Sequence, residues 1–265
     1  MTPSRRDLLR TLLGLPVLLA MPLPAHAAIS DITDAINKAG RQRMLSQRIA
    51  KAYAQLVLDI YPDRARKILD KSVALFDSQL AELQAFAPTP AIRAQYVQLG
   101  ELWLPYRSAT QGVPSLTGLK QIAGLNEGVL KTAHATTVAL EKHAGTATAH
   151  LVNISGRERM LSQRSAKFYL FRAAGLDSAN VDQGLATARK EFEAGLAELK
   201  AAPQDTAEIN SQLLLADSQW AFFANALNHY TPGAPNPVHL QYVAASSEYV
   251  LEVMDAATGL YQSLH

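Results

Sequence analysis

The chain has 265 residues, a formal net charge of +2 and no cysteine. The lack of cysteine excludes disulfides, thiolate metal sites and haem attachment through a Cys-x-x-Cys-His motif. Alanine and leucine dominate while glycine and proline are sparse, with 14 and 13 residues, a composition typical of an all-helical protein.

Residues 1–27 have the pattern of an export signal. Arg5 and Arg6 precede an apolar stretch over residues 12–21, and residues 25–27 (Ala-His-Ala) form a small-x-small cleavage site. The paired arginines resemble a twin-arginine signal, with an ordinary secretory signal or an uncleaved anchor as the alternatives. We therefore expect a periplasmic protein, cleaved near Ala27 and not inserted in the membrane afterwards.

The charge of the expected mature chain argues against two classes of partner. Removing the three arginines and one aspartate of residues 1–27 from the 25 basic and 23 acidic residues leaves 22 of each. A neutral protein has no overall field to attract nucleic acid or an anionic membrane. We expect neither as a partner.

The chain contains an internal sequence repeat. Residues 37–53 and 153–169 are identical at 12 of 17 positions, and Trp103 and Trp220, the only tryptophans, fall at matching places further on. A repeat of this length indicates duplicated domains rather than a solenoid. After the signal, the predicted domains are residues 28–145 and 146–265.

Each unit divides into four helical segments separated by proline and glycine. The predicted fold is all-α, with two tandem four-helix up-down bundles packed side by side as an intrachain pseudo-dimer. This packing requires the chain to reverse at Gly145; a continuous helix through residues 144–150 would instead stack the bundles end to end. The predicted helices cover residues 30–60, 63–87, 90–110, 118–143, 149–174, 177–201, 204–229 and 237–263.

An arginine in each copy falls on an apolar, small-sided helix face. A buried charge is costly unless it is paired or binds a ligand. If the two faces meet, their guanidinium groups repel each other unless a planar oxyanion lies between them and accepts paired hydrogen bonds. The alternative is pairing with acids or carbonyl groups of other helices. The predicted ligand-binding residues are Arg43 and Arg159, with Gly40, Gly156, Gln47 and Gln163 on the same faces.

Four neighbouring arginines fall on a different, polar strip of the same two helices. This strip also contains Lys51 and Gln55 in the first copy. We expect it to be a solvated basic surface rather than part of the binding site. The arginines concerned are Arg41, Arg48, Arg157 and Arg164.

The string AGRQRMLSQR over residues 39–48, with Asn37 two residues earlier, resembles the signature of the PilJ-type sensor domain. That domain is the extracytoplasmic N-terminal module of type IV pili methyl-accepting chemotaxis transducers. It is related to the nitrate/nitrite-sensing domain of NarX-like histidine kinases. The second copy keeps the pattern except at Ser155 and Glu158, and a Glu158 that turned inward would neutralise an arginine.

The resemblance implies a function. Domains of this family are four-helix bundles that pair side by side and bind nitrate or nitrite between their first helices. The ligand arginines would be Arg43 and Arg159, with backbone at Gly40 and Gly156 contributing. Here the tandem copy would replace homodimerisation, giving a monomer or weak dimer that reports to a membrane sensor kinase or chemoreceptor.

The competing hypotheses are a protein-docking or structural bundle without a small ligand and, third, an enzyme. The histidines form no i, i+3 or i+4 metal-binding pair with a carboxylate, and no nucleophile–base motif or phosphate loop occurs. We therefore expect no enzymatic activity, no metal and no cofactor.

Overall fold

The computed structural model describes residues 29–229 and 235–264, so the predicted export signal lies outside the described residues. The described part contains eight α-helices and no strand. Within it, no helix combines the length and apolar character needed to cross a membrane. The helices are α1 (Ile32–Val57), α2 (Pro62–Phe86), α3 (Pro90–Ala109), α4 (Leu116–Ala144), α5 (Ala147–Ala173), α6 (Ser178–Leu199), α7 (Ala207–Asn228) and α8 (Pro237–Gln262).

The helix boundaries follow from capping and proline. The side chains of Asp31, Ser115 and Thr146 accept hydrogen bonds from backbone amides in the first turns of α1, α4 and α5. These contacts satisfy donors that an uncapped helix would leave without a partner. Pro62 and Pro90 occupy the first turns of α2 and α3, where proline costs no hydrogen bond.

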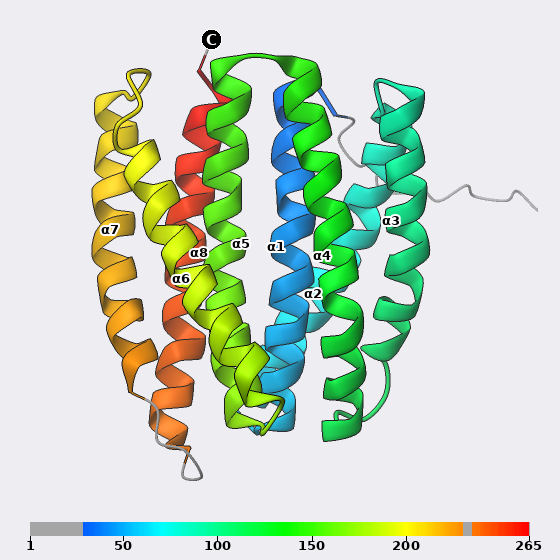
Figure 1. Cartoon of the computed structure of the whole chain (residues 1–265), viewed down its shortest axis with the longest axis vertical. Helices are drawn as coiled ribbons and strands as arrows, with labels where there is room; N and C mark the ends of the chain where they lie inside the picture. The colour runs from blue at the N-terminus through cyan, green and yellow to red at the C-terminus, as the bar shows by residue number, and fades with distance from the viewer. Residues whose placement is uncertain (1–28, 230–234, 265) are drawn as a thin grey trace, which may run out of the picture.

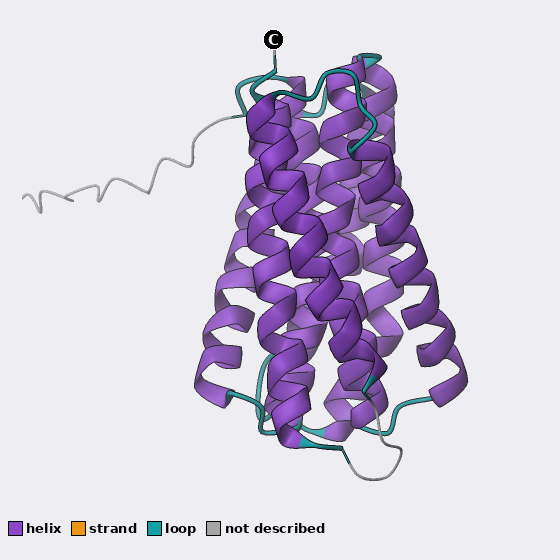
Figure 2. Ribbon diagram, turned by 90° about the vertical axis from the view of Figure 1, so that its left-hand side faces the viewer, coloured by secondary structure: helices purple, strands orange, loops and turns teal. Residues whose placement is uncertain are grey.

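The two repeats pack side by side through their first helices. α1 and α5 lie next to each other at the centre; α2 and α4 pack on α1, while α6 and α8 pack on α5 (Figure 1). The connecting loops gather at the two ends of the bundle (Figure 2). The predicted all-α fold of two four-helix bundles in an intrachain pseudo-dimer is thus confirmed.

The turn between the repeats sets this arrangement. α4 ends at Gly145, which has a φ of 64°, a left-handed conformation that glycine adopts without a steric penalty. Thr146 then caps α5, so the chain reverses direction at once. α5 therefore runs parallel to α1. The exact domain division at residue 145 stays a prediction, because buried residues of both repeats form one continuous core.

The duplication is visible inside both bundles. Trp103 stacks on Phe76 and Trp220 stacks on Phe192, each with ring centroids 3.8 Å apart. Both tryptophans are almost fully buried. Since large aromatic side chains contribute strongly to core packing, these stacks anchor α3 on α2 and α7 on α6.

Candidate functional site

α1 and α5 approach each other closely at a pair of glycines. A Cβ atom on Gly40 would lie 3.8 Å from the Cα atom of Gly156, 3.2 Å from Nη2 of Arg43 and 3.5 Å from Nη2 of Arg159. A Cβ on Gly156 would meet the same two guanidinium groups at 3.6 and 3.0 Å. The missing side chains therefore make room for two arginines between the helices. We call Gly40, Arg43, Gly156 and Arg159 the arginine site.

Arg43 is fully buried and bonds only neutral groups. Its Nη2 donates to the main-chain oxygen of Asn153 on α5 at 3.0 Å. Its Nη1 lies 3.2 Å from Nδ1 of His134 on α4. Because a guanidinium only donates, Nδ1 must be the acceptor, which leaves the His134 proton on Nε2. Within the described residues, Arg43 makes no ion pair with a carboxylate.

Arg159 is equally buried but is paired with an acid. Its Nη1 contacts the carboxylate of Asp255 on α8, which also pairs with Arg41 at 3.0 Å. Its Nη2 donates to the main-chain oxygen and the side-chain oxygen of Asn37 on α1, at 3.2 and 2.8 Å. The alternative expectation of pairing with an acid from another helix is therefore met at Arg159 and not at Arg43.

His134 and Asp255 occupy matching positions of the two repeats. Each arginine binds the main chain of the asparagine that begins the motif in the other repeat. Asn153 in turn contacts Glu141 on α4, and Asn37 contacts Gln262 on α8. Both Glu141 and Gln262 lie seven residues beyond His134 and Asp255 respectively. The arginine site is thus symmetric in its arginines and asymmetric in their partners.

Burial and charge set the protonation of these groups. The pKa of Arg43 falls to about 9, because of burial first and then repulsion by Arg159 and Arg157. Burial also lowers the pKa of Arg159 to about 10, with Arg41 acting in the same direction and Asp255 against it. Both guanidinium groups are charged at pH 7.

His134 stays neutral at the same pH. Its pKa falls to about 4, because partial burial and the cations Arg43 and Arg157 disfavour the imidazolium. Asp255 is held ionised by Arg159 and Arg41, which lower its pKa against the effect of its burial. The negative charge of Asp255 therefore offsets positive charge next to Arg159, whereas the positive charge of Arg43 is not offset by a carboxylate in contact with it among the described residues.

Glu158 does not neutralise the site by a direct contact. It is fully buried against α6, where a Cβ on Gly195 would lie 2.2 Å from its Oε1. Neither carboxyl oxygen has a hydrogen-bond partner within the described residues. Burial raises its pKa well above the usual range, although Arg157 and Arg43 oppose this. The first repeat carries Gln42 at this position, and its amide faces Phe76 on α2.

The predicted glutamines lie one turn below the arginines. Both Gln47 and Gln163 are fully buried. Gln47 donates to Oγ of Ser46 at 2.9 Å, and Gln163 donates to the main-chain oxygen of Ser247 at 2.8 Å. Each keeps a side-chain oxygen without a partner among the described residues.

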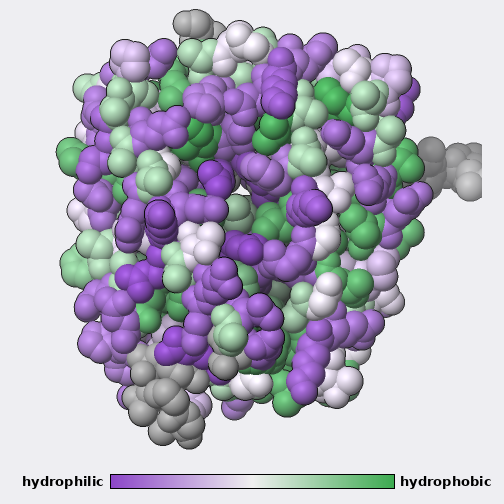
Figure 3. Space-filling model, in the orientation of Figure 1, coloured by the Kyte–Doolittle hydropathy of each residue, from purple (hydrophilic) through white to green (hydrophobic). Residues whose placement is uncertain are grey.

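A pocket of about 300 Å³ lies beside His134, on the side away from Arg43. Its walls include His134, Arg157 and Met160. The molecular face formed by α4, α5 and α6 is hollowed between α4 and α5, with hydrophilic side chains around the hollow (Figure 3). His134 is thus the residue between this pocket and Arg43.

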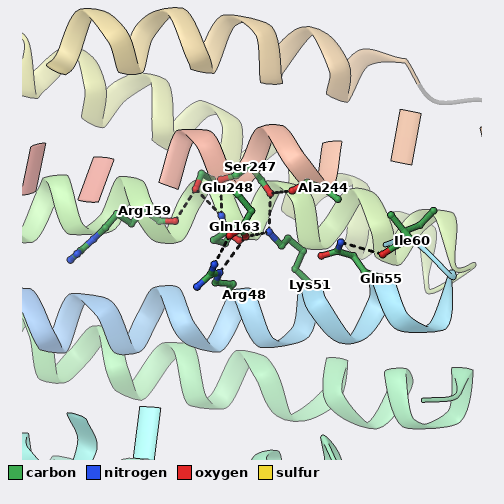
Figure 4. Close-up of polar contacts among 10 residues, drawn as sticks. Arg48, Lys51, Gln55, Ile60, Arg159, Gln163, Ala244, Ser247 and Glu248 are labelled. Atoms are coloured by element: carbon green, nitrogen blue, oxygen red, sulfur yellow. Dashed lines mark hydrogen bonds and ion pairs between the residues drawn. The ribbon is translucent and has the colours of Figure 1, made fainter. Parts of the chain in front are cut away.

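The polar strip predicted to be solvated is instead an interface between the repeats. Arg48 and Lys51 on α1 both pair with Glu248 on α8, and the Lys51 side chain is 0 % exposed (Figure 4). Arg164 and Lys167 on α5 pair in the same way with a carboxylate of α4. The prediction of a solvated strip was wrong wherever the fourth helix of the other repeat covers it; Arg157, whose side chain is 38 % exposed, pairs instead with α6 of its own repeat.

We call these groups the Glu248 cluster (Arg48, Lys51, Glu248) and the Glu127 cluster (Arg164, Lys167, Glu127). The remaining two arginines of the strip also form ion pairs, Arg41 with Asp255 and Arg157 with Glu191. A single helical wheel shows which residues share a face, but it contains no information about a helix supplied by the other repeat.

His134 and Asp255 were not among the predicted site residues. Their signal in the sequence is weak, because the fourth helices share few identical residues and align at a different offset from the first helices. Within the described residues, no group of three or more His, Asp and Glu side chains is placed to hold a metal ion.

The chain was compared with known families, curated proteins and solved structures. The family model of the type IV pili methyl-accepting chemotaxis transducer N-terminal domain, PilJ, matches it twice, over residues 30–124 and 144–245. No curated protein and no solved structure matches. The two matches cover most of the chain and reproduce its duplication. The chain therefore belongs to the PilJ family of periplasmic sensory domains, with two copies of the domain in tandem.

Proposed function

We propose that this protein is a periplasmic sensory protein that binds one nitrate or nitrite ion between α1 and α5, with Arg43 and Arg159 as its ligands. One observation carries the proposal: Arg43 is a fully buried cation with no carboxylate partner in residues 29–229 and 235–264, beside a second buried arginine across two glycines. An unpaired buried charge is destabilising, and a bound anion removes that cost.

The donors left at the site support a small planar oxyanion. The Nε atoms of Arg43 and Arg159 are buried and have no hydrogen-bond partner among the described residues. A buried donor without an acceptor costs about 1–3 kcal/mol, which a ligand oxygen recovers. A planar guanidinium matches two oxygens of such an ion at once. The backbone near Gly40 and Gly156 is close enough to the arginines to form the walls of the site.

The charges at the site favour an anion. Asp255 is shared by Arg159 and Arg41, and His134 is neutral at pH 7, so the arginines leave the site with a net positive charge. Glu141 and Glu158 attract Arg43 through space without a hydrogen bond to it.

The tandem arrangement fits a binding protein rather than an enzyme. One chain contains both halves of the site, so it needs no second copy and acts as a monomer or weak dimer. We propose that the bound state is recognised by a membrane chemoreceptor or sensor kinase. The family's role in chemotaxis transducers supports this kind of partner.

The direct test is isothermal titration of the purified protein with nitrate and with nitrite, beside Arg43→Ala and Arg159→Ala. We expect saturable binding of one anion per chain, lost in both variants. Arg159→Ala also frees the carboxylate of Asp255 to repel the ligand. One anion per two chains would contradict an intrachain site. No heat with either anion, with the helical circular dichroism spectrum intact, would refute anion binding.

A second candidate function, a protein-docking or structural bundle, is favoured by a different observation. Arg43 and Arg159 each donate to a main-chain oxygen of the opposite first helix, so they join α1 and α5 without any ligand. In that case both arginine variants lose stability equally in the presence and absence of nitrate. A thermal melt with and without the anion separates the two functions.

A further inference from the structure

A second pocket lies between α4, α5 and α6, apart from the arginine site. It has a volume of about 620 Å³. Phe168, Phe171, Leu176 and Val181 give it an apolar body, and the Glu127 cluster forms one end. An apolar pocket of this size with a few converging polar groups is the usual form of a small-molecule site.

The two repeats differ in sequence at this place. The second repeat has Phe168, Phe171 and Gly184 where the first has Ala52, Gln55 and Ile68. Gly184 is required by its neighbour, because a Cβ there would lie 2.5 Å from the ring of Phe168. In the first repeat, Gln55 reaches back to the main-chain oxygen of Ile60 at 3.5 Å (Figure 4). At this place the second repeat thus has aromatic side chains where the first repeat has a polar one.

The polar end of the pocket holds two cations and one carboxylate. Nζ of Lys167 lies 2.9 Å from Glu127, 2.9 Å from Oδ1 of Asn126 and 4.0 Å from the centre of the Phe168 ring. Arg164 contacts both oxygens of Glu127, at 3.1 and 2.9 Å. With Lys167 protonated, the net charge of this end is +1.

The carboxylate covers its cations less completely than in the matching cluster. The side chain of Glu127 is 51 % exposed, against 12 % for Glu248. Burial lowers the pKa of Lys167 to about 7, so Lys167 is a poorly stabilised cation. An incoming anion would compensate it, and Glu127 has access to water if it is displaced.

We propose that this pocket binds a monocarboxylate with a compact apolar body, such as an aromatic acid or a short branched aliphatic acid. The carboxylate contacts Lys167 and Arg164, and the body packs between Phe168 and Phe171. A cationic ligand of the same shape would meet two positive charges. Asp177, which also lines the pocket, already accepts a hydrogen bond from Asn180 at 2.6 Å.

The test is isothermal titration of the whole protein with benzoate and 3-methylbutanoate, beside benzyl alcohol and benzylamine as neutral and cationic controls of similar shape. We expect saturable binding of one acid per chain and none of either control. Binding of benzyl alcohol as tight as that of benzoate would overturn the role of the cations. Absence of saturable heat with both acids would overturn the site.

The repeats supply matched variants. Lys167→Met should weaken benzoate binding about 10- to 100-fold, the loss expected for a charged hydrogen bond. Lys51→Met, the same change in the Glu248 cluster, should leave it unchanged. An equal effect of both variants, or none from Lys167→Met, would contradict the proposal.

One further variant does not depend on a buried charge. Gly124 lines the pocket on α4, and a Cβ there would meet nothing within 4 Å, so Gly124→Leu should fold and obstruct the pocket. Benzoate binding should be lost while nitrate binding is kept. Retained benzoate affinity in this folded variant would place the acid elsewhere. Nitrate and benzoate are titrated separately, so a negative result for one ligand does not refute the site proposed for the other.

Discussion

The substitution His134→Asp tests whether the free charge of Arg43 is what binds an anion. It places in the first repeat the residue that pairs with Arg159 in the second. Nδ1 of His134 lies 3.2 Å from Arg43, and Asp255 shows that an aspartate at the matching position reaches its arginine. The variant therefore puts a tethered carboxylate where we propose that a diffusible anion binds.

The expected magnitude follows from the contact it creates. A hydrogen bond between charged groups contributes about 1.5–3 kcal/mol, which we reduce to about 1–2 kcal/mol because position 134 is partly exposed. For a protein of this size that raises the Tm by about 2–8 °C. Since an anion must now displace the aspartate, its affinity should fall about 5- to 30-fold.

The assay is a thermal melt without added anion, followed by titration with nitrate. His134→Asn is the matched control, since it removes the ring without adding charge and should keep most of the affinity. The reciprocal variant Asp255→His should lower the Tm at low salt and increase the stabilisation that nitrate provides. Unchanged nitrate affinity in folded His134→Asp would refute the assignment of Arg43 as the ligand.

Three further predictions follow from the same contacts. Because the pKa of His134 is lowered in the folded protein, the unfolded chain binds a proton at this position at a higher pH than the folded chain does. The free energy of unfolding should therefore be highest above pH 6.5 and fall by about 1 kcal/mol as the pH drops toward 4. Denaturant titrations of His134→Asn should not show this loss. Gly40→Ala should change the free energy of unfolding by less than about 1 kcal/mol, because the gain in helix propensity is offset by the 3.2 Å approach of the new Cβ to Arg43, but it should weaken nitrate binding. The control is Gly259→Ala, whose Cβ meets nothing within 4 Å and which should leave nitrate binding intact. Equal nitrate affinity in the two variants would contradict the close fit at Gly40. In urea unfolding, Lys51→Met should lower the free energy of unfolding by about 1–2 kcal/mol more than Lys167→Met does. The reason is that Lys51→Met leaves the mostly buried Glu248 with one cation, whereas Glu127 can turn to water after Lys167→Met. Equal losses would contradict an effect of this difference in exposure.

The sequence was sufficient to predict the helices, the duplication and the meeting of the first helices. The repeated motif places Arg43 and Gly40 on one face, and a left-handed Gly145 allows α5 to lie beside α1. These features depend on local periodicity and on one turn, and both are determined by residues that are close together in the sequence.

The partners of the arginines could not be predicted in the same way. His134 and Asp255 come from α4 and α8, about 90 residues away along the chain from the arginines they contact. Lys51 was placed on a solvated strip for the same reason, since Glu248 on α8 supplies its partner. The contacts of the arginines depend on how the first and fourth helices of one repeat pack, and that of Lys51 on how the two bundles meet; no single helix pattern contains either.

The duplication itself offers a reason for the asymmetric site. In a symmetric homodimer every residue near the two-fold axis is present twice, so an aspartate beside one arginine is matched by an aspartate beside the other. A fused pair of repeats can place a histidine at one position and an aspartate at the other, as His134 and Asp255 show. We therefore infer that fusion allowed Arg159 to be held by an internal acid while Arg43 stays available for the anion that we propose, which an identical pair of subunits cannot achieve.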